Sequence, residues 1–225
     1  MARKLRKNYI EHAGERYHER AAPEAYELAL EFMSRVARGR AIDLAAGSGY
    51  TSRRLEELGF DVTAYDIFTE QFVPRDIIIR KADLNQPLPE EDGALDAVLA
   101  LEVIEHLENP RAFLREIARV LKPGGSLVLS TPNIVTFGSK LRFAFLEELE
   151  LFFNDVTRTR DPFCDEASGH ISPLLPWLLR MFVHDAGMTV LETGYTRRWG
   201  LRTKHLGRSA ILWIEKPAEP RVVAS

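Results

Sequence analysis

Two carboxylates and an imidazole lie within five positions, 102–106, of the segment LEVIEHLENP. If a helical turn begins at Glu102, then Glu102, Glu105 and His106 share one face, because positions i, i+3 and i+4 are neighbours on a helix. Carboxylate oxygens suit a divalent cation such as Mg, and an imidazole nitrogen shifts the preference toward Mn, Fe or Zn. His170, in the segment SGHISP, offers a fourth ligand. The pattern therefore indicates a metal site, and His106 and His170 are also the candidate catalytic bases.

A second interpretation of the same segment needs no metal. Two acids ahead of a helix also stabilise the positive end of the helix dipole. His106 and His170 can equally be hydrogen-bonded, half-buried histidines with a structural role. At the level of sequence both interpretations stay open.

Short apolar runs of strand length alternate with helical patterns along the chain. We expect strands at 40–46, 61–66, 76–83, 95–101, 126–131, 188–195 and 209–215. Helices are expected after Pro23, after Gly49, from Asn109-Pro110, where Asn is a helix cap and Pro suits the first turn, and over 174–187. This alternation predicts an α/β fold with a doubly wound, mostly parallel seven-stranded sheet and helices on both faces.

The composition is that of a globular protein. Of the 225 residues, 45% are hydrophobic and 28% are charged, and the formal net charge is -3, which argues against a protein that coats nucleic acid. The single cysteine, Cys164, excludes an intrachain disulfide and a zinc site built from several cysteines. The N-terminus lacks the apolar run of a signal peptide, and no segment reaches the roughly 20 apolar residues of a membrane span. We therefore expect a cytoplasmic location.

Polar residues end five of the predicted strands. They are Asp43, Asp66, Asp83, Glu102 and Asn133. Parallel strands present their carboxyl ends at one edge of a sheet, and ligands of such folds bind just outside that edge. We therefore expect these side chains to gather around a ligand.

The turn after the first predicted strand is made of small residues, in the segment DLAAGSG. Gly47 and Gly49 would let the backbone approach a ligand closely, because no side chain intervenes. The acid that ends the next strand, Asp66, can accept hydrogen bonds from both hydroxyls of a ribose, and Asp83 can accept one from an adenine amino group. A nicotinamide enzyme shares part of this pattern, but Ser52 stands where the third glycine of its fingerprint would be.

Together these segments resemble the class I S-adenosylmethionine-dependent methyltransferases. The resemblance rests on DLAAGSG, ADLNQPLP, LDAVLALEVIEHLENP and FLREIARVLKPGGSLVLSTPN, and it is strongest with the ubiquinone-biosynthesis O-methyltransferase type. It implies a Rossmann-like fold and S-adenosyl-L-methionine as cofactor. The cofactor residues that it implies are Asp43, Ala45, Gly47, Gly49, Asp66, Ile67, Asp83, Leu84 and Leu101. Ala45 is a departure, because the family has a glycine at that position.

The Glu-x-x-Glu-His pattern with a distant histidine also resembles the metal site of the Hen1-type RNA 2′-O-methyltransferases. That resemblance implies a metal held by Glu102, Glu105, His106 and His170, with neighbouring hydroxyls of the acceptor beside the transferable methyl group.

We expect a single domain over residues 1–225. Its parts are an N-terminal helical segment (1–38), a cofactor-binding core (39–133), a lid insertion after the fifth strand (134–169), the C-terminal part of the sheet (170–216) and a tail (217–225). Phe143 and Leu146, on the apolar face of a helix in the insertion, would cap an apolar substrate. In the N-terminal segment, Tyr17 or Arg20 would meet the carboxylate of the cofactor.

The favoured function at this stage is methyl transfer to a small-molecule acceptor, at a hydroxyl oxygen rather than a nitrogen. The segment TRRWGLRTKHLGRS carries five basic residues and no acid, which motivates two other interpretations. It is either a site for a phosphate, a nucleic acid or an anionic surface, or a solvated loop. One alternative is methylation of the terminal ribose of an RNA, which this segment and the four possible metal ligands motivate. Another is a cofactor-binding module without catalysis, which Ala45 motivates. The sequence leaves the acceptor and the oligomeric state open.

Overall fold

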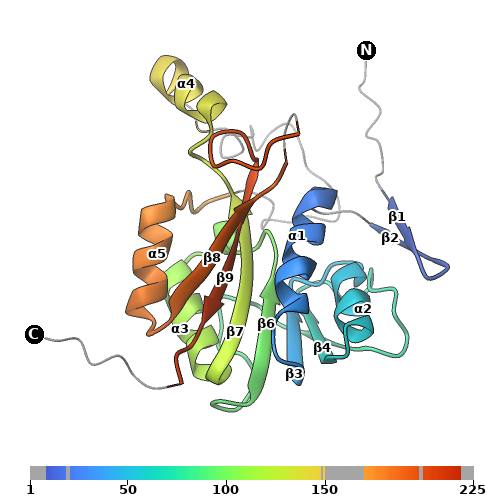
Figure 1. Ribbon diagram of the computed structural model, residues 1–225. Coiled ribbons are helices and arrows are strands. Elements are labelled where there is room, and N and C mark those ends of the chain that lie inside the picture. The colour runs from blue at the N-terminus through green and yellow to red at the C-terminus, as the bar shows by residue number, and fades with distance from the viewer. Residues whose placement is uncertain (1–8, 19–20, 148, 150–169, 198–199, 219–225) are drawn as a thin grey trace, which may run out of the picture.

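The fold is known from a computed structural model, which describes residues 9–18, 21–147, 149, 170–197 and 200–218. Its centre is a seven-stranded sheet in the order β5-β4-β3-β6-β7-β9-β8 (Figure 1). Every pairing from β5 to β7 is parallel, and β9 pairs antiparallel with both of its neighbours. The strands are β3 (Arg40–Leu44), β4 (Asp61–Asp66), β5 (Ile78–Lys81), β6 (Leu95–Ala100), β7 (Leu121–Pro132), β8 (Thr189–Tyr195) and β9 (Ser209–Glu215). The predicted mostly parallel, seven-stranded sheet is confirmed.

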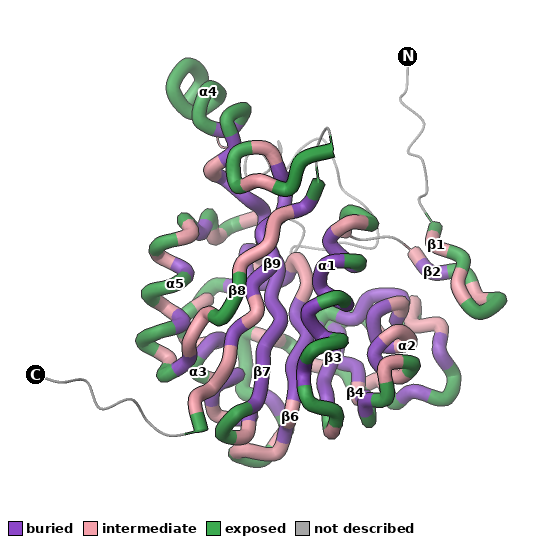
Figure 2. Tube along the Cα trace, in the orientation of Figure 1, coloured by how far each residue is buried: buried purple, intermediate pink, exposed green. Residues whose placement is uncertain are grey.

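Helices cover both faces of this sheet. One core joins α1 and α2 to one face, and a second core joins α3 and α5 to the other. Figure 2 shows the central strands buried between these two layers. The helices are α1 (Pro23–Ser34), α2 (Tyr50–Glu57), α3 (Pro110–Val120) and α5 (Pro176–Asp185), and a short 3-10 turn, η1 (Ile104–His106), precedes α3.

The local sequence explains where α3 begins and which face it buries. Pro110 occupies its first turn, and the side chain of Asn109 accepts a hydrogen bond from the backbone N–H of Ala112. This bond satisfies one of the donors that the first helical turn leaves without an intrahelical partner. Phe113 and Ile117, spaced by one helical turn, are buried against the sheet. The helix predicted from Asn109-Pro110 is therefore confirmed.

The N-terminal segment differs from the prediction of helix. Residues 9–18 form an antiparallel hairpin of β1 (Tyr9–His12) and β2 (Glu15–His18), and helix begins only at α1. Ala13 and Gly14 connect the strands, and both have positive φ. A two-residue turn with positive φ at both positions has the twist that an antiparallel hairpin needs. The hairpin lies beside α2 in Figure 1.

A helix does form at the start of the predicted lid insertion. This helix, α4 (Phe137–Leu146), points away from the sheet in Figure 1, and only Ser139 within it is buried. Residue 148 and residues 150–169 lie outside the described residues, so the lid remains a prediction. Across the described ranges, no helix is both long enough and apolar enough to cross a bilayer.

Candidate functional site

A cavity of about 810 Å³ opens at the carboxyl ends of the central strands. The chain passes from β3 outward to β4 and β5, and then returns to β6 on the other side of β3. Such a reversal in strand order is where parallel α/β sheets bind ligands. Many residues predicted from sequence line this cavity, namely Asp43, Ala45, Gly47, Asp66, Ile67, Asp83, Leu84, Leu101, Glu102, His106 and His170.

Asp43, at the end of β3, is buried and accepts two short hydrogen bonds. The hydroxyls of Thr51 and Ser52 donate to the same carboxylate oxygen, at 2.7 and 2.6 Å. Burial raises the pKa of Asp43 to about 6, although the two hydroxyls act in the opposite direction. Both hydroxyls belong to the first turn of α2, so Asp43 links β3 to the helix that follows the turn at residues 45–49.

The turn between β3 and α2 has the left-handed backbone that favours glycine. Ala45, Gly47 and Gly49 have φ values of 55°, 56° and 87°. A side chain on Gly49 would meet the ring of Phe72 at 2.6 Å, so this glycine packs against protein and does not line the cavity. Ala45 holds its conformation at a cost, because a β-carbon crowds the backbone at positive φ.

Asp66 holds the same turn from the neighbouring strand. Its carboxylate accepts the backbone N–H of Gly47 through one oxygen and that of Phe68 through the other, both at 2.8 Å. A carboxylate has about four acceptor positions, so two remain for a ligand. Asp83 is more exposed, and its side chain accepts hydrogen bonds from the backbone and the side chain of Asn85.

Three predictions about site residues need correction. Tyr17 is completely buried, donates its hydroxyl hydrogen to Glu15 and does not line the cavity. Asn133 binds the backbone carbonyls of Lys204 and Gly207, and therefore fixes the basic loop instead of facing the cavity. Gly49, as described above, packs against Phe72. Arg20 lies outside the described residues.

His18 is a lining residue that the sequence analysis missed. Its carbonyl accepts a hydrogen bond from the Ser48 hydroxyl at 3.0 Å, and its Nδ1 is buried with no hydrogen-bond partner among the described residues. Within the hairpin, the residue that lines the cavity is therefore His18, the neighbour of Tyr17. No spacing in the sequence marks it, because its position depends on the hairpin.

Glu102 follows β6 with a backbone φ of 51°. Its N–H donates to the hydroxyl oxygen of Ser130, and that hydroxyl in turn donates to the Glu102 carboxylate at 2.8 Å. Burial raises the pKa of Glu102 above its ordinary value. The left-handed backbone also takes Glu102 out of the helical turn, which starts at Ile104.

The structure brings Glu105, His106 and His170 together. One potential ligand atom from each lies within 4.8 Å of the other two, and the two imidazole rings are 4.7 Å apart between centroids. Glu102 is not in this group. The four-ligand prediction placed it on one helical face with Glu105 and His106, but Glu102 lies outside the helical turn. Three of the four predicted ligands are therefore grouped, and their role as metal ligands remains a prediction.

Glu105 is fully buried, and its two carboxylate oxygens differ. Oε2 accepts a hydrogen bond from Thr131, whereas Oε1 has no hydrogen-bond partner among the described residues. Burial, and next the charge of Glu102, raise the pKa of Glu105 well above its ordinary range. A buried carboxylate oxygen without a donor is costly unless a proton or a cation satisfies it.

Main-chain hydrogen bonds hold the segment that begins at His170 beside Glu105. The carbonyl oxygen of Glu105 accepts the N–H groups of Ile171 and Ser172, both at 2.9 Å. The hydroxyl of Ser172 donates to the carbonyl of Leu107. The η1 turn and the segment after residue 170 are therefore held together by their backbones, whatever occupies the site.

Comparison with known proteins agrees with this arrangement. Residues 42–129 match a protein family described as a methyltransferase domain. The computed structure resembles an S-adenosylmethionine-dependent methyltransferase from Mesorhizobium loti, with a TM-score of 0.60 over 85% of this chain and 97% of that one, at 15% identity. The chain has the class I methyltransferase fold. Residues 42–129, over which the family match extends, contain the turn and the acids Asp43, Asp66 and Asp83.

Sequence similarity to curated proteins is confined to part of the chain. A ubiquinone biosynthesis O-methyltransferase from Caulobacter vibrioides is 39% identical over 101 residues, which are 41% of this chain and 40% of that protein. The chain thus matches less than half the length of such relatives. The [4+2]-cyclase SpnF has a TM-score of 0.63 at 19% identity, over 96% of this chain and 89% of that one. The fold alone therefore does not decide the reaction.

Proposed function

We propose that this protein transfers the methyl group of S-adenosylmethionine to a hydroxyl oxygen of a small-molecule acceptor. The observation that carries the proposal is one shared cavity at the reversal of strand order between β3 and β6. The acids Asp43 and Asp66 line it together with His106 and His170. Its volume of about 810 Å³ lies within the range of small-molecule sites, roughly 300–1,000 Å³. The O-methyltransferase relatives support oxygen as the acceptor atom.

The residues present suit the cofactor. Ala45 and Gly47 give a turn without large side chains, and Asp66 has acceptor positions left for ribose hydroxyls. Asp83, at the rim, accepts from the adenine end. The bound cofactor supplies an activated methyl group, so the protein needs mainly to orient the acceptor and keep water out.

The second half of the cavity suits a divalent cation beside the acceptor. Glu105, His106 and His170 offer one carboxylate and two imidazoles, a donor set typical of Zn, Fe or Mn. Glu105 Oε1 is the buried oxygen that such an ion would satisfy. A cation held there would bind the acceptor oxygen. Without one, His106 and His170 are the groups on the cavity wall that can take the hydroxyl proton.

Calorimetric titration with S-adenosylhomocysteine, the cofactor product, tests the cofactor assignment. Stoichiometric binding is expected in the wild type, with affinity about tenfold weaker in Asp83→Ala, since one or two hydrogen bonds are lost without disturbing the core. NAD serves as the competing ligand and is expected not to bind. Binding of NAD in place of S-adenosylhomocysteine would overturn the proposal.

Thermal unfolding with and without metal tests the acceptor half. Protein saturated with S-adenosylhomocysteine is titrated with Mg, Mn, Fe(II) or Zn, and at least one ion is expected to raise the melting temperature. Glu105→Gln and His170→Ala should remove the gain, while His184→Ala, an exposed histidine on α5, should keep it. An unchanged melting temperature with every ion would reject the metal and assign the proton acceptor to the histidines.

Methylation of the terminal ribose of an RNA is a second candidate, favoured by one observation. Arg208, in the basic loop, lines the same cavity as His170, so the loop reaches the site. RNA binding that weakens steeply with salt would support this candidate. Absence of RNA binding at low salt would leave the small-molecule acceptor.

A further inference from the structure

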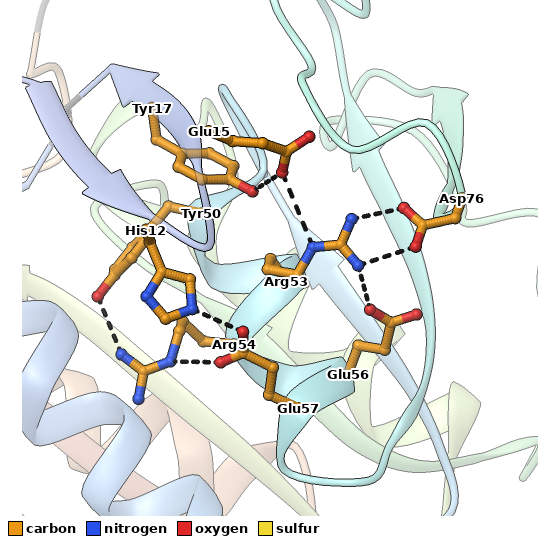
Figure 3. A network of polar contacts seen from close by, with 9 residues as sticks. All are labelled: His12, Glu15, Tyr17, Tyr50, Arg53, Arg54, Glu56, Glu57 and Asp76. Atoms are coloured by element: carbon orange, nitrogen blue, oxygen red, sulfur yellow. Dashed lines mark hydrogen bonds and ion pairs between the residues drawn. The ribbon is translucent and has the colours of Figure 1, made fainter.

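Arg53, on α2, connects two segments that are distant in sequence (Figure 3). Its two terminal nitrogens bind the carboxylate of Asp76 at 2.9 and 2.5 Å, ahead of β5. On the other side its Nε lies 3.9 Å from Glu15 of the hairpin, and the hydroxyl of Tyr17 donates to the same Glu15 oxygen. Glu56, one turn along α2, also binds Arg53, at 2.5 Å. One guanidinium thus contacts carboxylates from β2, from its own helix α2 and from the segment ahead of β5.

Both connected segments form walls of the cavity. The hairpin ends at His18, which lines the cavity and accepts a hydrogen bond from Ser48 through its carbonyl. The segment 67–76, between β4 and β5, supplies Ile67 and further lining residues. Its Val73 N–H donates to the carbonyl of the same Ser48 at 3.0 Å. The two walls therefore meet over the cofactor turn.

The hairpin depends on such docking contacts for its position. A two-stranded hairpin is at best marginally stable by itself in water. The contacts with α2 include the Arg53 group, the hydrogen bond between His12 and Glu57 at 2.6 Å, and the packing of the Tyr17 ring against Tyr50. The Arg53 side chain is 15% exposed and Asp76 is 61% exposed, so water and salt reach the pairs from one side.

We propose that Arg53 is a positioning residue that closes the hairpin and the segment 67–76 over bound cofactor. In this arrangement the cofactor exchanges only when the pairs of Arg53 open. The inference rests on the proposed function, because it takes the cavity as the cofactor site. It adds a role for the hairpin, which lies outside residues 42–129, the range of the family match.

The test is the release rate of S-adenosylhomocysteine, measured by stopped-flow dilution and competition. Arg53→Gln is expected to release it about tenfold faster than wild type, because the bidentate pair and the contact with Glu15 are both lost. Asp76→Asn and Glu15→Gln should each give part of that increase. Arg53→Lys should fall between wild type and Arg53→Gln, since it retains the charge without the paired geometry.

Salt provides a readout that a purely structural role would not change. Screening of partly exposed ion pairs should speed release from wild type between about 0.05 and about 0.5 M NaCl. Release from Arg53→Gln should already be fast and should depend little on salt. A salt response of equal size in both proteins would overturn the inference.

Arg119 provides the matched control. It also binds carboxylates, those of Glu116 and Asp92, but it makes no hydrogen bond or ion pair with the hairpin or with the segment 67–76 among the described residues. Arg119→Gln should lower the melting temperature and leave the release rate unchanged. If wild type does not bind S-adenosylhomocysteine, the proposed function fails. If it binds and Arg53→Gln releases at the wild-type rate, or Arg119→Gln accelerates release equally, only the role of Arg53 fails.

Discussion

Two residues at the cavity, one at the end of β3 and one in the turn after it, are held in arrangements that lower the stability of the folded protein. Ala45 has a left-handed backbone, and Asp43 is buried at the end of β3 with a raised pKa. Each arrangement costs free energy in the folded protein. Strained backbone and buried charges are commonly retained at functional sites. We therefore expect substitutions of Ala45 and Asp43 to raise the free energy of unfolding.

Ala45→Gly should stabilise the protein. The left-handed conformation costs alanine about 1–2 kcal/mol, and the greater freedom of glycine in the unfolded chain offsets about 0.5–1 kcal/mol of the relief. We expect a net gain of about 0.5–1 kcal/mol, measured by urea denaturation. Ala46→Gly, at a neighbouring position without positive φ, should destabilise the protein, and an equal gain there would contradict the explanation.

Asp43 should make stability fall as the pH rises through its folded pKa of about 6. Between the unfolded value near 3.8 and the folded value, the folded protein holds a proton that the unfolded chain releases. Above about pH 6 the penalty is complete, at most about 3 kcal/mol for a shift of this size. Asp43→Asn should therefore be more stable than wild type at pH 7.5, and the difference should vanish near pH 4, by urea denaturation. A constant difference across this range would contradict the assignment.

The elements around the site were predictable to different degrees. The strands and α3 follow from local signals, because runs such as SLVLST and the Asn109-Pro110 start need no knowledge of the tertiary fold. The hairpin was missed because its strands are short and largely polar, although Gly14 between two four-residue strands is a turn signal. The grouping of Glu105 with His170 was anticipated, but the exclusion of Glu102 depends on a backbone reversal that residue types do not reveal.

Asn109→Ala should destabilise α3 by about 1 kcal/mol, because the N–H of Ala112 would lose its cap. Asn109→Asp should retain most of the stability, since aspartate caps as well and favours the positive helix end. Thermal unfolding of the three proteins under the same buffer conditions measures both effects. Equal losses in the two variants would show that the cap contributes nothing.

At the scale of the molecule, large apolar side chains have two different surroundings. Phe113 is buried in the core between the sheet and α3, whereas Phe145, near the end of α4, is 79% exposed. A side chain this exposed buries little apolar surface on folding, so it contributes little to the free energy of unfolding. Phe143, on the predicted apolar face of the insertion helix, is also 58% exposed, because periodicity reports a face and not what covers it.

Phe145→Ser should leave the free energy of unfolding within about 0.5 kcal/mol of wild type, as for other surface positions. Phe113→Ala should lower it by about 3–5 kcal/mol through loss of buried surface and creation of a cavity. Chemical denaturation of both variants tests the contrast. A large loss in Phe145→Ser would mean that α4 packs against something in the folded protein.

The strand order also has a consequence for biosynthesis. Strand β9 lies between β7 and β8 in the sheet, yet it follows both of them in the sequence. Until residues 209–215 emerge from the ribosome, the edge of β7 that pairs with β9 has no partner. Strand β8 has no neighbour in the sheet during the same interval. Unpaired edges of this kind invite association between chains. A ribosome stalled before residue 209 would expose such an edge, so binding of a chaperone during that interval would protect the nascent chain from association.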